Sequence, residues 1–289
     1  MTKPRLGLVA TWESLDLDTD GEFLIPACED AGFDVEVPVW RDANVDWSSF
    51  DLVVVRATWD YFSAPEEFLD WIHRVDAVTT LHNSAEVMAW NIDKRYLDEL
   101  AEAGFPVVET SFVADADAVW SADLGRTVVK PTISAGSNDT TVYDSGDDPA
   151  VAAHVKRLVA DGRVAMVQPY IEEIDTLGER GLVFYRGLLD HTFRKEPMLV
   201  GDREKTALFL REEISAATPT SEEVSLGLSI MDWLTNRFGG ILYSRVDLVE
   251  QDGSPVVMEV ELIEPGFFLN VDPPSAHRFA AVLAKLVGQ

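Results

Sequence analysis

The chain has 289 residues, with 23 Lys or Arg against 51 Asp or Glu, and its formal net charge at pH 7 is −28. This excess of carboxylates repels phosphates, which makes nucleic acids and anionic membranes poor partners. The single cysteine, Cys28, excludes an internal disulfide and a cysteine-based metal cage. No stretch reaches the roughly 18 apolar residues of a membrane span, so we expect a cytoplasmic protein, of about two domains by its length.

Short apolar strands alternate with helical patterns over the first 80 residues, which predicts a parallel sheet with crossover helices. A second unit is expected from residue 85, and residues 171 to the end indicate a mostly antiparallel sheet with helices. The expected strands are 6–10, 34–39, 52–55, 77–79, 107–112, 127–130, 140–142, 165–168, 182–185, 188–194, 241–249 and 255–263. The expected helices are 21–31, 65–75, 85–103, 149–160, 221–238 and 275–287.

Two loops follow predicted strands of the N-terminal sheet, at the edge where open parallel sheets collect ligands. One spans 11–18, and the other contains Arg56, Thr58, Trp59 and Asp60, which offer a cation, a hydroxyl and a carboxylate. We take these four as candidate substrate-binding residues. The alternative is that Arg56 and Asp60 pair with each other and Trp59 fills a domain interface.

A group of carboxylates is predicted near the C-terminus. Strand residues alternate sides, so Glu259 and Glu261 share one face while Met258 faces the other way. If residues 252–254 form the hairpin loop, Asp247 lies beside Glu259 and Arg245 beside Glu261. Three crowded carboxylates require a cation, and hard oxygen ligands suit Mg²⁺ with a nucleotide, with Mn²⁺ as an alternative metal. The other interpretation is a solvated acidic face.

The predicted strand 127–130 ends in Lys130 and continues into a loop of small and hydroxyl residues. Such a loop lets backbone N–H groups approach a polyphosphate, while the lysine supplies a fixed positive charge. It is not a Walker motif, because Gly-Lys-Ser/Thr is absent, and the alternative is an ordinary turn. The candidate phosphate-binding residues of this loop are Ser134, Gly136 and Ser137.

The segment 166–175 passes from an apolar strand through Pro169 into an acidic stretch. A nucleoside base could bind its backbone, with Tyr170 or Ile171 against the base and Glu172 or Glu173 on the ribose. An interdomain crossover is the alternative interpretation.

Two consecutive cations, Arg194 and Lys195, end the predicted strand that begins at residue 188. In an acidic domain they are candidates for binding a substrate carboxylate or a transferring phosphate. His191 lies in the same stretch, but the five histidines show no metal-ligand spacing, so we expect no histidine metal centre.

The order of these features resembles the ATP-grasp superfamily, in the branch of glutathione synthetase and RimK-type ligases. The similarity covers nearly the whole chain. Within the superfamily, the chain is similar to an actinobacterial group that includes the O-ureido-D-serine cyclo-ligases of D-cycloserine biosynthesis. The segments that resemble this group are VVVRATWDY (53–61), NSAEVMAWNIDKRYL (83–97), VQPYIEEIDTLGE (167–179), HTFRK (191–195) and EVELIEPGFFLN (259–270).

This resemblance implies an ATP-grasp fold of the α/β and α+β classes, with an N-terminal Rossmann-like domain (1–84), a central lobe (85–170) and a C-terminal lobe (171–289). It also implies that Lys94 and Lys130 hold the phosphates of ATP, and that Asp247 and Glu259 bind magnesium. Glu261 stands where the family commonly has asparagine, and Gly266, a substrate candidate, where the cyclo-ligase group is expected to have serine. The implied nucleotide pocket comprises Gln168, Tyr170, Ile171, Asp175 and Glu179, and the implied catalytic cations are Arg194, Lys195 and Arg245.

The implied reaction converts a substrate carboxylate into an acyl phosphate, which an amine then attacks. The acid and the amine could lie in one amino-acid-like molecule, as in the cyclo-ligases, or in two, as in peptide-forming ligases. A non-catalytic binding module is a further alternative, and a homodimer is a candidate oligomeric state. A nicotinamide oxidoreductase is disfavoured, because the first strand lacks the G-x-G-x-x-G turn.

Overall fold

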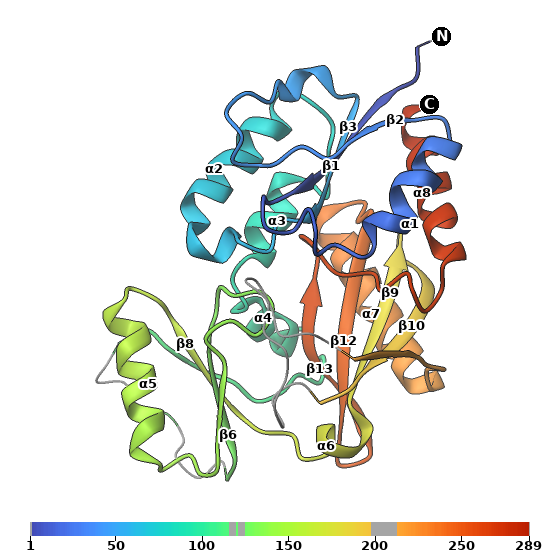
Figure 1. Cartoon of the computed structure of the whole chain (residues 1–289). Helices are drawn as coiled ribbons and strands as arrows, with labels where there is room; N and C mark the ends of the chain where they lie inside the picture. The colour runs from blue at the N-terminus through green and yellow to red at the C-terminus, as the bar shows by residue number, and fades with distance from the viewer. Residues whose placement is uncertain (1, 116–119, 121–124, 198–212, 289) are drawn as a thin grey trace.

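The computed structural model describes all residues except 1, 116–119, 121–124, 198–212 and 289 (Figure 1). Its described strands form three sheets that follow one another along the chain. These sheets fall within the three predicted ranges 1–84, 85–170 and 171–289, whose boundaries stay a prediction. None of the described helices combines the length and the apolar composition that a membrane span requires.

The N-terminal sheet is parallel, as predicted, with the order β2-β1-β3-β4. Its strands are β1 (Arg5–Ala10), β2 (Asp34–Glu36), β3 (Leu52–Ala57) and β4 (Leu81–His82), and its helices are α1 (Gly21–Asp30), η1 (Trp47–Ser49), η2 (Tyr61–Ser63) and α2 (Pro65–Asp76). All six residues of β3 are buried, as expected of a central strand. The strand expected at 77–79 is wrong, because the amides of residues 77–79 bond back to carbonyls of α2 and only then does β4 begin.

The middle sheet is antiparallel, with the order β5-β8-β6-β7, and α5 (Pro149–Ala160) packs against it (Figure 1). Its strands are β5 (Ser111–Val113), β6 (Thr127–Pro131), β7 (Thr141–Tyr143) and β8 (Ala165–Pro169). The single helix expected at 85–103 is wrong, because the chain forms α3 (Ala85–Asn91) and α4 (Tyr96–Glu102). Between them the Lys94 amide donates to the Thr132 carbonyl at 3.0 Å, which takes this amide out of a continuous helical ladder.

The C-terminal sheet has the order β11-β10-β9-β12-β13 and is antiparallel, as predicted. Its strands are β9 (Glu179–Tyr185), β10 (Leu188–Lys195), β11 (Ile214–Ala216), β12 (Tyr243–Gln251) and β13 (Ser254–Glu261), and its helices are α6 (Ile174–Leu177), α7 (Ser221–Phe238) and α8 (Pro274–Val287). α7 begins with a capping box between Thr220 and Glu223. α8 returns to lie beside α1, so one apolar cluster contains residues from both ends of the chain (Figure 1).

The β12–β13 hairpin differs from the expected three-residue loop but preserves the predicted register at the site. Gln251 pairs with Ser254, which leaves a two-residue turn with positive φ at Asp252 and Gly253. A bulge at Met258 restores the pairing of Asp247 with Glu259. The bulge also re-aims Met258, which lines the same cavity as Glu259, so the prediction that it faces the opposite side is wrong.

Candidate functional site

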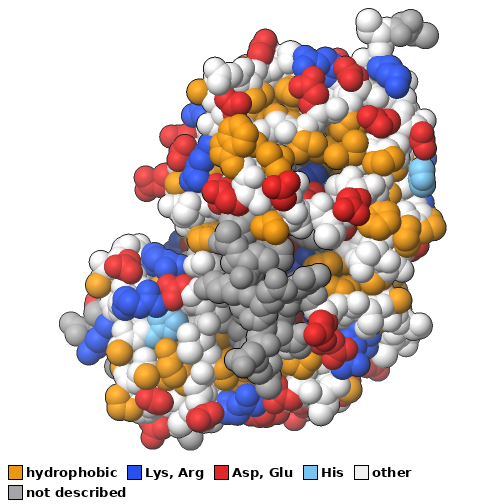
Figure 2. All heavy atoms as spheres, viewed as in Figure 1, with side chains coloured by type: hydrophobic (Ala, Val, Ile, Leu, Met, Phe, Trp, Pro, Cys, Tyr) orange, Lys and Arg blue, Asp and Glu red, His pale blue; other side chains and the backbone are white. Residues whose placement is uncertain are grey.

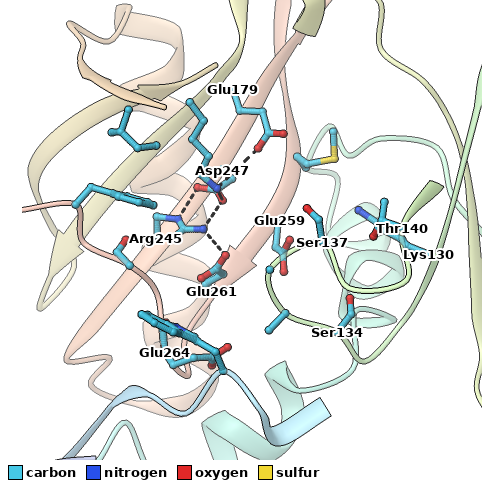
Figure 3. A pocket seen from close by; sticks show the side chains of 18 of the residues that line it. Lys130, Ser134, Ser137, Thr140, Glu179, Arg245, Asp247, Glu259, Glu261 and Glu264 are labelled. Carbon is cyan, nitrogen blue, oxygen red and sulfur yellow. Dashed lines mark hydrogen bonds and ion pairs between the residues drawn. The ribbon is translucent and has the colours of Figure 1, made fainter. Parts of the chain in front are cut away.

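A cavity of about 970 Å³ lies between the middle sheet, the C-terminal sheet and the loops that follow β1 and β3 (Figure 3). It brings together most of the predicted site residues from all three parts of the chain. The predicted residues that line it are Trp59, Lys94, Lys130, Ser134, Gly136, Ser137, Gln168, Tyr170, Ile171, Glu179, Lys195, Arg245, Asp247, Glu259, Glu261 and Gly266. Arg56, Thr58, Asp60, Asp175 and Arg194 do not line it.

The predicted carboxylate face is present, with Arg245 paired to Glu261 and Asp247 paired to Glu259 across β12 and β13. Both oxygens of Asp247 accept from the Arg245 guanidinium at 2.8 Å, and one also accepts from the Lys195 ammonium at 2.7 Å. Burial opposes ionisation, but these cations prevail and lower the pKa of Asp247 to about 2. Asp247 is therefore a fixed negative charge at neutral pH.

The other two carboxylates also depend on neighbouring cations. Glu259 lies 3.1 Å from the Lys94 ammonium, and its pKa is lowered despite burial because Lys94 and Lys130 are close. Glu261 accepts from Arg245, but burial and the charges of Glu259 and Asp247 raise its pKa to about 7. The three carboxylates are thus crowded, as predicted, and Arg245 and Lys94 compensate part of their charge.

A hard divalent ion is chemically compatible with this donor set, since three carboxylates on neighbouring strands share one cavity wall. In the described arrangement their oxygens do not form a group of three within 4.8 Å of one another. One oxygen of Glu259 pairs with Lys94, one oxygen of Glu261 accepts from Arg245, and both oxygens of Asp247 accept from Arg245 or Lys195.

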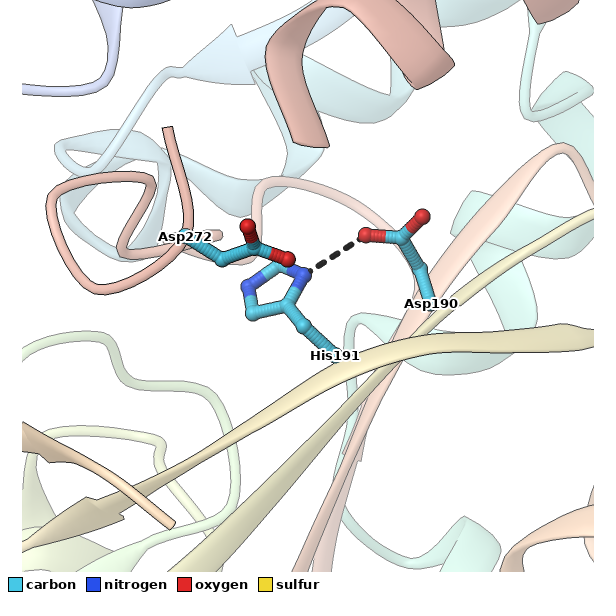
Figure 4. Close-up of side chains that lie close together, drawn as sticks. All are labelled: Asp190, His191 and Asp272. Carbon is cyan, nitrogen blue, oxygen red and sulfur yellow. Dashed lines mark hydrogen bonds and ion pairs between the residues drawn. The ribbon is translucent and has the colours of Figure 1, made fainter. Parts of the chain in front are cut away.

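Within the described residues, the group of three acidic or histidine ligand atoms that does meet this distance lies elsewhere, at Asp190, His191 and Asp272 (Figure 4). His191 Nδ1 lies 2.8 Å from Asp190, and its Nε2 lies 2.7 Å from the Phe267 carbonyl. Arg278 donates to both Asp190 and Asp272 at 2.6 Å. These ion pairs connect β10 to α8 and satisfy the cluster without a metal.

Lys94 and Lys130 reach the cavity from different elements. Lys94 lies in the break between α3 and α4, and its ammonium donates to the Ser134 carbonyl at 2.8 Å as well as pairing with Glu259. Lys130 is at the end of β6, and no residue in the described part of the chain forms a hydrogen bond or ion pair with its ammonium. Burial and the like charges of Lys94 and Lys195 lower the pKa of Lys130.

Asp139 anchors the small-residue loop that follows Lys130. Its carboxylate accepts from Arg157 at 3.0 Å and from Arg163 at 2.7 Å, and His154 Nε2 lies 3.2 Å away. Within the loop, Gly136 and Ser137 both have positive φ, at 57° and 58°. Their conformation turns the chain so that Ser134, Gly136 and Ser137 all line the cavity.

The crossover after β8 forms another part of the wall. Gln168 donates from its side chain to Thr110 at 2.8 Å, and the Arg126 guanidinium stacks 3.9 Å from the Tyr170 ring. The Tyr170 hydroxyl donates to Asp175, which therefore supports the wall from behind it. The two ribose candidates do not line the cavity: Glu172 pairs with Arg126, and Glu173 accepts from the Asp252 amide.

Strand alternation separates the two consecutive cations of β10. Lys195 points into the cavity and binds Asp247, whereas Arg194 donates to the Thr176 carbonyl at 3.0 Å and to Glu196 at 3.1 Å. Neighbouring residues of a strand face opposite sides, so only one of the pair can reach the cavity. A direct contact between Arg194 and a ligand is not supported by this geometry.

Arg56 is a buried connector rather than part of the cavity wall. Only 1% of it is exposed, and its guanidinium lies 3.3 Å from Asp20 and donates to the Pro265 carbonyl at 2.8 Å. It also stacks 3.9 Å from the Phe267 ring. Arg56 thereby fixes the segment after β13, which lines the cavity, against the N-terminal sheet.

Asp60 has other partners than Arg56, so the expected alternative pairing is wrong. It accepts from the Trp40 indole at 2.7 Å and from Arg41 at 2.6 Å. Thr58 is fully buried, and its hydroxyl has no described hydrogen-bond partner. Trp59 donates from its indole to the Glu264 carbonyl at 3.3 Å and does line the cavity.

Sequence reasoning marked the loop at 11–18 without naming Asp18 as a site residue, and it did not single out Glu264; both acids line the cavity. Burial and the nearby charges of Glu261 and Glu259 raise the pKa of Glu264 well above its usual range. Burial also raises the pKa of Asp18 to about 6, against the effect of Arg56. The sequence feature that pointed to Asp18 and Glu264 was their position, since each follows a strand that ends at the cavity.

Comparisons with known proteins agree with this architecture. Residues 7–83 match the family described as D-cycloserine synthetase DcsG, N-terminal domain. The cycloserine biosynthesis protein DcsG of Streptomyces lavendulae is 35% identical over 301 residues, which cover 97% of this chain and 98% of that protein.

Solved structures extend the similarity to the whole fold. The crystal structure of D-cycloserine synthetase DcsG matches with a TM-score of 0.88 and 33% identity, covering 98% of this chain and 99% of the other. D-alanine–D-alanine ligase from Bacillus anthracis gives a TM-score of 0.68 at 14% identity, with 99% and 96% covered. A RimK domain ATP-grasp protein from Sphaerobacter thermophilus gives 0.66 at 18% identity, with 99% and 100% covered.

The last two similarities are of fold alone, and they confirm the expected ATP-grasp architecture. The relationship to DcsG extends to sequence over nearly the full length of both chains. The chain is therefore an enzyme, and it belongs to the DcsG family of ATP-grasp ligases.

Proposed function

We propose that the enzyme forms a carbon–nitrogen bond within an amino-acid-like molecule, with O-ureido-D-serine as the substrate to test first. The observation that carries the proposal is the composition of one cavity wall, where three lysines and Arg245 lie among Asp247, Glu259 and Glu261. A wall of this kind suits a polyphosphate and a divalent ion. The similarity to a cycloserine biosynthesis protein supports the choice of substrate.

In this proposal, ATP occupies the part of the cavity between the middle and C-terminal sheets. Lys94 and Lys130 bind its phosphates, with backbone N–H groups of the loop at residues 134–137. The crossover from Gln168 to Ile171 binds the adenine. The cavity volume of about 970 Å³ is near the upper end of ligand pockets, which leaves room for a small second substrate.

Asp247, Glu259 and Glu261 would hold Mg²⁺, or Mn²⁺ as the alternative. A divalent ion at this wall supplies positive charge against the phosphate oxygens. Lys195 and Arg245 lie on the same wall and neutralise charge on the carboxylate that is activated. Asp247 fixes both cations in place, since it accepts hydrogen bonds from each.

The proposed reaction has two steps. A carboxylate oxygen of the substrate attacks the γ-phosphorus of ATP, and the bond to ADP breaks, which yields an acyl phosphate. The substrate nitrogen then attacks the acyl carbon, loses a proton, and expels inorganic phosphate. No protein nucleophile takes part, which is consistent with the burial of Cys28.

The test is to incubate the enzyme with ATP, Mg²⁺ and O-ureido-D-serine and to measure ADP, phosphate and product mass. We expect one ADP per product and a product mass equal to the substrate minus one water. Separate acid and amine panels, with hydroxylamine to trap the activated acid as a hydroxamate, test the peptide-forming alternative. ADP release that does not depend on any acid, with neither hydroxamate nor dehydrated product, would contradict the proposal.

A further inference from the structure

The strand that carries Glu259 and Glu261, β13, is at the edge of the C-terminal sheet and pairs within that sheet with β12. The backbone N–H and C=O groups on the outer side of an edge strand need other partners where they are buried. Near the start of β13, the backbone of residues 106–108 supplies these partners for Val257. Near its end, beside the two carboxylates, the partners are side chains.

Two of these side chains, Asn91 and Tyr96, reach the outer side of β13 from the ends of α3 and α4 (Figure 1). Asn91 donates to the Val260 carbonyl and accepts from the Leu262 amide, both at 2.8 Å. The Tyr96 hydroxyl donates to the Val260 carbonyl and accepts from the Val260 amide, both at 2.9 Å. Asn91 and Tyr96 are both buried, so their bonds take the place of those from a neighbouring strand. We call these two residues the clamp residues.

The clamp residues lie on either side of Lys94 in the sequence. The Lys94 ammonium lies 3.1 Å from Glu259, and Val260, which both clamp residues bind, directly follows Glu259. Four hydrogen bonds therefore join the short segment that carries this lysine to the strand that carries the carboxylates.

The position of Lys94 matters because cations are scarce in this protein. The formal net charge is −28, and acidic side chains are spread over the face of the molecule that Figure 2 shows. A nucleotide phosphate is therefore attracted by the few lysines of the cavity and repelled by the carboxylates beside them. Lys94 and Glu259 can act together on one nucleotide only if their separation is maintained.

We propose that the clamp residues are positioning residues of the ligase site: they hold Lys94 at a fixed distance from Glu259, so that both act on one nucleotide. This inference rests on the proposed function, in which Lys94 binds phosphate and Glu259 binds the metal ion. Tyr96 acts without touching the ligand, since it does not line the cavity and its hydroxyl is bonded to Val260. The alternative is a role in stability alone, because Tyr96 also packs in an apolar cluster with Val260.

Tyr96→Phe separates these two roles, because it keeps the ring in the cluster and removes only the hydroxyl. Calorimetry with Mg²⁺ and a non-hydrolysable ATP analogue measures its effect in the wild type and in Lys94→Gln. We expect binding to weaken about tenfold in the wild-type background but less than about twofold in Lys94→Gln, since the effects of residues in one network are not additive. A residue that only stabilises the fold should have the same effect in both backgrounds.

Tyr185→Phe is the matched control, because Tyr185 is also buried and its hydroxyl bonds Ser275 on α8 rather than β13. Both tyrosine variants should lower Tm by a similar few degrees, whereas only Tyr96→Phe should weaken binding of the analogue. Asn91→Ala is the second variant, and its effect should depend on Lys94 in the same way. Additive losses in the two backgrounds, or an equal loss of binding from Tyr185→Phe, would overturn the inference.

The ligase assay separates this inference from the proposed function. Tyr96→Phe should lower kcat about 10- to 100-fold, the scale of a misplaced catalytic group, and change KM for the acid substrate less than about threefold. If the wild type converts its acid and Tyr96→Phe keeps full kcat and full affinity for the analogue, the reaction stands and the positioning role is wrong. If binding of the analogue shows the expected dependence on Lys94 but no acid causes ADP release, the positioning role stands and the proposed reaction is wrong.

Discussion

Asp139, which anchors the small-residue loop after Lys130, gives a prediction whose magnitude follows from the structure. Asp139 is held by Arg157, Arg163 and His154, and its side chain is 20% exposed. The hydrogen bond from Arg157 and the nearby positive charges lower its pKa from 3.8 to about 2. A shift of this size corresponds to about 2.5 kcal/mol. Arg157 is half exposed, so solvent screening reduces the contribution to about 1–1.5 kcal/mol.

We therefore expect Asp139→Asn to lower Tm by about 2–5 °C at pH 7. This is the change in Tm that a loss of about 1–1.5 kcal/mol causes in a chain of this length. The folded pKa of Asp139 lies below its unfolded value. The contribution is thus complete above about pH 4 and is lost as the pH falls toward 2. The difference in Tm between wild type and variant should shrink over that interval.

The same substitution should affect nucleotide binding, because the loop that Asp139 anchors lines the cavity at Ser134, Gly136 and Ser137. We expect KM for ATP to rise several-fold with a smaller change in kcat, measured by ADP formation. Asp161→Asn is the control, since Asp161 is exposed and lies 3.9 Å from Arg157. A variant with unchanged Tm at pH 7 and unchanged KM for ATP would refute the reasoning, as would equal effects from the control.

Three further substitutions test the site. Glu259→Gln should reduce kcat by more than about 100-fold, the scale of a lost electrostatic group, with little change in Tm, and a fully active variant would contradict the metal assignment. Lys195→Ala should impair turnover far more than Arg194→Ala, because only Lys195 reaches Asp247; equal losses in a steady-state assay would argue against this division. Asp20→Asn should destabilise the fold by about 2–3 kcal/mol in chemical denaturation, since one oxygen that accepts backbone amides is replaced by a donor; an unchanged midpoint would show that these bonds contribute little.

Local sequence patterns determined much of the secondary structure of this protein and part of its candidate site. The alternation of strands and helices predicted the parallel N-terminal sheet, because a parallel pair needs a crossover helix. The period of two placed Glu259 and Glu261 on one face, and hairpin pairing placed Asp247 and Arg245 beside them. The shared face of Glu259 and Glu261 follows from neighbouring residues, whereas the pairing with Asp247 and Arg245 holds because the bulge at Met258 offsets the shorter turn.

The tertiary structure decided which polar groups face the cavity and which hold the fold together. Arg56 bonds the carbonyl of Pro265, 209 residues away, and no local pattern distinguishes such a connector from a ligand-binding arginine. The break after α3 depends in the same way on a carbonyl of a distant loop, at Thr132. The sequence implies that Arg194 and Lys195 face opposite sides of their strand, because residues alternate along a strand. Which of the two side chains faces the cavity was decided by the arrangement of the strands in the sheet.

Glu264 shows most clearly what the sequence alone could not determine. Its position just beyond β13 was visible, but its burial arises only when Trp59, Tyr61 and the segment after β13 pack together. The charge balance of the cavity likewise results from residues of three separate sheets. Sequence thus determined most elements and the shared face of Glu259 and Glu261 through short-range periodicity, whereas long-range packing decided which charges are compensated and which remain available to a ligand.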